Sequence, residues 1–153
     1  MPDFKEKKLR VTSVFQVSTD EELELLLFTP RIQAGFPSPA DDYLAEKLDL
    51  NKFLIKNPAV TYCVRVEGDS MTGAGIFSGD ILIVDRSIQP RENLIVIAIL
   101  DSELTVKWLK RHNGKLCLCP DNDEFAPIEI TEGADFQIWG VVVHSIHTFY
   151  QKR

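Results

Sequence analysis

The fold is decided by residues 94–119, which read LIVIAILDSELTVKWLKRHNGKLCLC. Three runs rich in β-branched and other apolar residues are separated by Asp101-Ser102 and by Asn113-Gly114, which are turn-forming pairs. An Asn-Gly pair tolerates the positive φ angles of the tight turn that joins two antiparallel strands. The stretch therefore predicts three consecutive antiparallel strands.

The same pattern extends in both directions from this stretch. Short β-rich runs separated by Gly, Asp, Asn and Ser recur from residue 59 to residue 143. The predicted strands cover residues 60–66, 81–84, 94–100, 104–109, 116–119 and 136–143. Closely spaced strands of this kind predict a mainly β domain with a curled or barrel-like sheet.

The first 58 residues have a different texture. Residues 11–15 are strand-like, whereas residues 21–28 fit a helix or a strand, because short apolar runs do not distinguish the two. Ser38-Pro39-Ala40-Asp41 has the residue types of a helix start and predicts a short helix through Tyr43, Leu44 and Leu48. A second helical segment is predicted around residues 50–54, ending near Asn57-Pro58.

Length and charge limit the possible functions. The 153 residues, 44% hydrophobic and 26% charged, suit one compact domain with a short arm. Seventeen Lys and Arg against 23 Asp and Glu give a net charge of −6, which argues against strong direct binding of nucleic acid. No apolar run approaches membrane-spanning length, and the first residues lack a signal-peptide pattern. We expect a cytoplasmic protein that does not bind membranes.

The cysteines and histidines do not have the spacing of a metal site. Cys63, Cys117 and Cys119 form no Cys-x-x-Cys pair, and their odd number does not suit a disulfide framework. We expect them to be small buried hydrophobic residues. No metal and no cofactor is expected.

Two residues could carry chemistry. Ser70 follows Gly68-Asp69, at the end of a predicted strand, where a turn could present a nucleophile. Lys107 interrupts a strand-forming run, and a lysine that loses hydration could act as a general base. A plain turn serine and a lysine on the exposed face of a half-buried sheet are the alternatives. Residue pattern alone favours those alternatives and does not place the two residues together.

The order of the motifs is more specific. Ala34-Gly35-Phe36-Pro37-Ser38-Pro39-Ala40-Asp41-Asp42-Tyr43 is followed by Gly68-Asp69-Ser70-Met71, then by Gly79-Asp80, Thr105-Val106-Lys107 and Gly140-Val141-Val142. Over roughly residues 28–147 this succession resembles the LexA/UmuD family of self-cleaving Ser-Lys peptidases, peptidase family S24.

The resemblance implies a LexA/UmuD-type, β-clip-like catalytic domain. In it Ser70 is the nucleophile, Lys107 is the general base, and the bond between Ala34 and Gly35 is cut within the chain itself. Residues 1–34 would form a cleavable N-terminal arm, and residues 35–153 the protease-like domain. Backbone N–H groups around Ser70 are expected to stabilise the oxyanion, and tethering raises the effective concentration of the substrate.

The resemblance also implies partners. A RecA filament on single-stranded DNA would stimulate cleavage in the SOS response. The truncated homodimer would then serve a Y-family, UmuC-like translesion polymerase. Only 33 residues precede Ala34, which favours the UmuD branch over a repressor with a DNA-binding domain. The alternatives are a LexA-type or phage-encoded regulator without that domain, acting through mixed dimers, and a non-catalytic binding module of the same fold.

Overall fold

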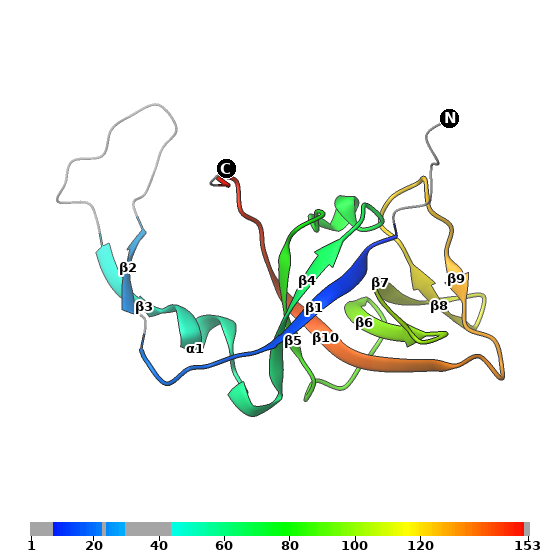
Figure 1. Cartoon of the computed structure of the whole chain (residues 1–153), viewed down its shortest axis with the longest axis horizontal. Helices are drawn as coiled ribbons and strands as arrows, with labels where there is room; N and C mark the ends of the chain where they lie inside the picture. The colour runs from blue at the N-terminus through cyan, green and yellow to red at the C-terminus, as the bar shows by residue number, and fades with distance from the viewer. Residues whose placement is uncertain (1–7, 23, 30–43, 152–153) are drawn as a thin grey trace.

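The computed structural model describes residues 8–22, 24–29 and 44–151 (Figure 1). The described part is mainly β, with one short α-helix, α1 (Leu50–Leu54), and two short 3-10 helices, η2 (Pro58–Val60) and η3 (Thr72–Ala74). The strands are β1 (Arg10–Gln16), β2 (Glu24–Thr29), β3 (Leu44–Asp49), β4 (Thr61–Glu67), β5 (Ile81–Asp85), β6 (Leu94–Leu100), β7 (Glu103–His112), β8 (Lys115–Cys119), β9 (Ile128–Glu129) and β10 (Phe136–Ile146).

Eight strands form one antiparallel sheet in the order β1-β4-β5-β10-β6-β7-β8-β9. β1 also pairs with β7, through Arg10 and Thr105, so the sheet closes on itself into a barrel. In Figure 1, β1 crosses the front of this barrel between the β4 and β7 sides. The predicted mainly β, curled sheet is confirmed.

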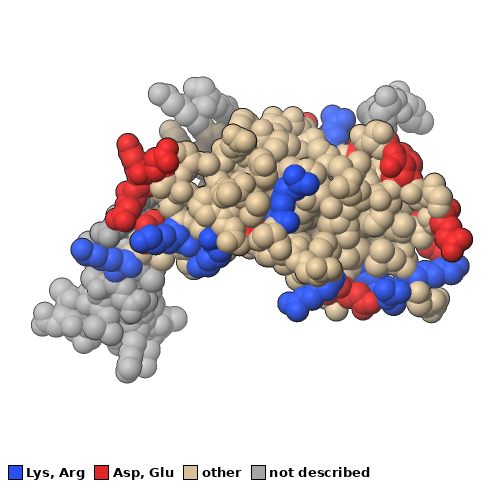
Figure 2. All heavy atoms as spheres, turned by 90° about the horizontal axis from the view of Figure 1, so that it is seen from below, with Lys and Arg blue, Asp and Glu red and all other residues tan. Residues whose placement is uncertain are grey.

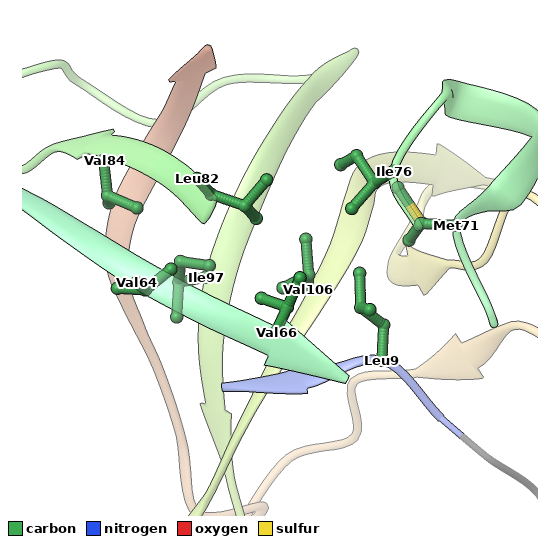
Figure 3. Packing of buried hydrophobic residues seen from close by; sticks show 9 residues of the cluster. All are labelled: Leu9, Val64, Val66, Met71, Ile76, Leu82, Val84, Ile97 and Val106. Carbon is green, nitrogen blue, oxygen red and sulfur yellow. The ribbon is translucent and has the colours of Figure 1, made fainter. Parts of the chain in front are cut away.

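The central strands are apolar on both faces because a buried cluster packs on each face. Neighbouring side chains of a strand point to opposite faces. Ile97 therefore joins the cluster inside the barrel, whereas Val96 and Ala98 join a second cluster on the other face of β6. The buried members of the inner cluster, shown in Figure 3, are Leu9, Val64, Val66, Met71, Ile76, Leu82, Val84, Ile97 and Val106.

The prediction of a helix through Leu44 and Leu48 is wrong. Residues 44–49 form β3, which pairs antiparallel with β2 in a separate two-stranded sheet. Backbone pairing with residues 24–29 therefore overrides the local helix pattern of residues 44–49. The same pairing shows that residues 24–29, most of which fitted either a helix or a strand, form a strand. The predicted helix start at Ser38 lies outside the described residues.

Other local predictions are confirmed. α1 begins after Asp49, whose carboxylate accepts hydrogen bonds from the backbone N–H groups of Asn51 and Lys52. Asn113 and Gly114 have φ angles of 52° and 75°, as the tight turn between β7 and β8 requires. The two-residue strand β9 was not predicted. Within the described part of the chain, no helix is long and apolar enough to cross a membrane.

Candidate active site

Ser70 lies on a turn that follows β4. The turn begins at Gly68, whose φ of 120° favours glycine, and a Cβ there would lie 2.3 Å from the carbonyl oxygen of Lys8. The Ser70 side chain is fully buried, so this turn does not simply present a serine to solvent. The chain packs closely around the hydroxyl group.

A loop after β8 holds this turn in place. The Asp121 N–H donates to the Ser70 carbonyl at 2.8 Å, and the Gly73 N–H donates to the Asp121 carbonyl at 2.7 Å. The Asn122 side chain donates to the Asp69 carbonyl at 2.8 Å. Trp108 Nε1 donates to the Asp121 carboxylate at 3.1 Å, which ties the same loop to β7. The serine turn and the strand that carries Lys107 therefore share one support.

Lys107 is carried by β7, where it pairs with Val96 of β6. Its Nζ lies 3.0 Å from Ser70 Oγ, although 37 residues separate the two in sequence. Only 1% of Lys107 is exposed. The alternative of a lysine on the exposed face of the sheet is therefore wrong.

The other contacts of the Lys107 amine indicate how its hydrogens are arranged. Nζ donates to the Val106 carbonyl at 3.1 Å and lies 3.0 Å from Thr105 Oγ1. The Thr105 hydroxyl donates to the Leu9 carbonyl at 3.0 Å, so its oxygen is left to accept from Lys107. A neutral amine has two N–H bonds, and both are used by these contacts. Its lone pair then faces Ser70 Oγ, as a general base requires.

The surroundings also favour the neutral amine. Burial lowers the pKa of Lys107, and the positive charge of Lys8 lowers it further, from 10.5 to about 8. At neutral pH roughly a tenth of such a group is uncharged, compared with less than a thousandth of a solvated lysine. The site therefore holds a serine beside an amine that can accept its proton.

Leu9 completes the surroundings of the serine. Its backbone N–H donates to Ser70 Oγ at 2.9 Å across 61 residues of sequence. Sequence reasoning missed Leu9 and the Asp121–Asn122 loop. The first residues carried only a basic pattern, and Asp121-Asn122-Asp123 has the composition of an ordinary turn.

The other residues considered from the sequence add nothing to this described site. Ala34 and Gly35 fall outside the described residues. Cys63, Cys117 and Cys119 are free thiols, the second buried and the other two half-buried. His147 contacts Asp80, and His144 packs on Phe53.

A comparison with known protein families identifies the family of this chain. The profile of the Peptidase S24-like family matches residues 26–143, which include Ser70, Lys107 and most of the barrel. The chain belongs to this family. Membership of this family indicates a protein of the serine peptidase type.

Individual relatives of this S24-like protein cover most of its length. Protein ImpA of Salmonella typhimurium is 44% identical over 85% of this chain and 88% of its own. Protein MucA of Escherichia coli is 41% identical over 78% of this chain and 82% of its own. These similarities confirm the resemblance to the UmuD branch and place the chain in an SOS-related family of self-cleaving proteins.

A repressor is also similar. LexA repressor 2 of Xanthomonas axonopodis is 37% identical over 86% of this chain, which spans only 61% of the repressor. The shared region therefore covers most of this chain but a smaller part of the repressor.

Proposed function

We propose that the chain cuts itself between Ala34 and Gly35, with Ser70 as nucleophile and Lys107 as general base. The observation that carries this proposal is the 3.0 Å contact between Ser70 Oγ and the buried Lys107 Nζ. The pKa of Lys107, lowered to about 8, supports its role as the base. Residues 1–34 are then the cleavable arm and residues 35–153 the catalytic domain.

The proposed reaction follows from the contacts of the site. Ser70 Oγ attacks the Ala34 carbonyl carbon while its proton passes to the Lys107 lone pair. The protonated amine then gives this proton to the Gly35 nitrogen as the peptide bond breaks. Water hydrolyses the acyl-serine and restores the serine. Backbone N–H groups of the Ser70 turn stabilise the oxyanion in both steps.

The family supplies the proposed biological setting. A RecA filament on single-stranded DNA stimulates the cleavage in the cytoplasm, and the shortened chain serves a Y-family, UmuC-like translesion polymerase as a homodimer. Exposed Phe149 and Tyr150, 93% and 85% accessible, offer apolar surface for a partner chain. Figure 2 shows a face whose acidic and basic side chains are interspersed around a mostly uncharged centre, which suits protein partners better than DNA.

The test is intact-mass analysis of the purified full chain. The chain is incubated at pH 7 and pH 10, and separately with RecA, ATP and single-stranded DNA. Two fragments that meet between Ala34 and Gly35 are expected, and Ser70→Ala and Lys107→Ala should abolish them. Ser18→Ala and Lys110→Ala are matched controls at exposed positions and should cut normally. An uncut wild-type chain under every condition would leave a binding module of the same fold.

A further inference from the structure

A groove beside Ser70 already holds an extended peptide, and that peptide belongs to this chain. Residues 8–11 lie between the end of β4 and β7, where Arg10 is in register with both Glu67 and Thr105. The Leu9 carbonyl accepts from the Val106 N–H at 3.3 Å and from the Thr105 hydroxyl at 3.0 Å. These are the contacts by which a strand adds to the edge of a sheet.

The side chain of Leu9 anchors this segment. Leu9 is fully buried, and Figure 3 shows it beside Val66, Val106, Met71 and Ile76. The neighbouring Gly68 leaves room for the backbone of residue 8, because a Cβ at Gly68 would overlap the Lys8 carbonyl. The groove is thus shaped for an extended peptide with a large apolar side chain.

The rim of the groove matches the charge of the segment. Lys8 and Arg10 flank the buried leucine, and the carboxylates of Glu67 and Glu103 line the same open pocket of about 490 Å³. Acidic groups at this rim favour a basic peptide. Lys8 and Arg10 therefore share this pocket with two acidic residues, while Leu9 between them is buried.

Residues 8–11 lie directly against Ser70. The Leu9 N–H donates to Ser70 Oγ at 2.9 Å, and the Ser70 side chain is fully buried, so the attacking oxygen is covered. A peptide bond can reach Ser70 between β4 and β7 only when this segment moves away.

We infer that the groove between β4 and β7 is a binding site for an extended basic-apolar-basic peptide, and that residues 8–11 occupy it as a built-in competitor of the cleavage segment. The regulatory part rests on the proposed self-cleavage. The uncut chain is blocked while residues 8–11 are docked. Cleavage requires their release, so anything that displaces them accelerates the reaction.

The first experiment compares rates of self-cleavage by intact-mass analysis. Deletion of residues 2–9 removes Lys8 and the Leu9 anchor of the competitor without placing a charge in the core. Leu9→Asp should release the segment, because a buried carboxylate at this position would be costly. Both variants are expected to cut between Ala34 and Gly35 at least about tenfold faster than the wild type. Val14→Asp, an exposed change on the same strand, is the matched control and should leave the rate unchanged. Equal or slower cutting by the folded deletion variant overturns the competitor role.

The second experiment measures binding without catalysis. A fluorescein-labelled peptide of residues 4–13 is added to the wild type and to the deletion variant, and anisotropy is followed. Binding to the deletion variant but not to the wild type is expected, and the peptide should slow the cutting of that variant. No binding overturns the groove assignment, whether or not the chain cuts itself.

The two experiments separate the two proposals. Peptide binding without any self-cleavage would support the groove and refute the proposed function. Self-cleavage without peptide binding would support the proposed function and refute the groove. A fragment that begins at Leu9 would identify residues 8–11 as a substrate and overturn their role as a competitor.

Discussion

The pH dependence of self-cleavage tests the Lys107 assignment most directly. The pKa of Lys107 is lowered from 10.5 to about 8, first by burial and then by the charge of Lys8. Only the neutral amine accepts the Ser70 proton, so the rate should follow the neutral fraction of Lys107. That fraction rises from roughly a tenth at pH 7 to about nine-tenths at pH 9.

The expected profile is therefore a rise of about tenfold between pH 7 and pH 9, followed by a plateau. A lysine with an ordinary pKa would instead give about a hundredfold rise over the same interval and a continued increase above it. The rate constants come from intact-mass analysis of the full chain at intervals between pH 6 and pH 11. Lys110→Ala, exposed on the same strand, should retain the wild-type profile.

Two results would refute the reasoning. A rate that is constant from pH 6 to pH 10 would exclude a lysine with this pKa as the base. A profile that is still rising at pH 10.5 would show that Lys107 is hydrated in the reacting chain, contrary to its burial. Circular dichroism at each pH confirms that the fold is retained over the range compared.

Three further predictions concern the loop that holds the Ser70 turn and the free energy of burying Lys107. In Gly73→Ala the new Cβ would lie 2.3 Å from Asp121 Oδ1, so the Ser70 turn should shift and self-cleavage should fall at least about tenfold with an unchanged circular dichroism spectrum; wild-type cutting would contradict the role of the loop. Asn122→Ala removes the hydrogen bond to the Asp69 carbonyl and should lower the free energy of unfolding, measured in urea, by about 1 kcal/mol or less. The cleavage rate should fall as well, and a change in neither quantity would show that this bond is dispensable. Lys107→Met should make the chain more stable to urea at pH 7, because a pKa lowered from 10.5 to about 8 corresponds to a cost of roughly 3 kcal/mol, partly offset by the lost hydrogen bonds. This advantage should be full below pH 8 and shrink as the pH rises towards 10.5, since the unfolded wild type binds the extra proton in that interval; a pH-independent difference would contradict it.

The strands were predictable because their determinants are local. The apolar runs of β6 and β7 and the Asn113-Gly114 turn fix strand direction and position through neighbouring residues alone. β3 was not predictable in the same way. Residues 44–49 carry a helix-like pattern, and only their pairing with residues 24–29 makes them a strand.

The candidate site, too, was predictable only where its determinants are local. The motifs marked Ser70 and Lys107 as candidates, but alternation along the strand left the lysine on a face that could have been exposed. The Ser70 turn contacts the Lys107 amine from a distant part of the sequence, and the lysine is buried. The contacts of Leu9 and Asp121 join segments far apart in sequence, so no local pattern could have indicated them.

The position of β1 links the proposed cut to the stability of the barrel. β1 closes the seam between β4 and β7, yet it lies within residues 1–34, on the far side of the proposed cut from Ser70. After cleavage β1 is held only by non-covalent contacts, and its release leaves the facing backbone groups of β4 and β7 to water or to another strand. The released chain would therefore differ from the uncut one in more than length, since it gains an open sheet edge beside an emptied apolar groove. The proposed cut of a single bond would thus change the surface that the barrel presents.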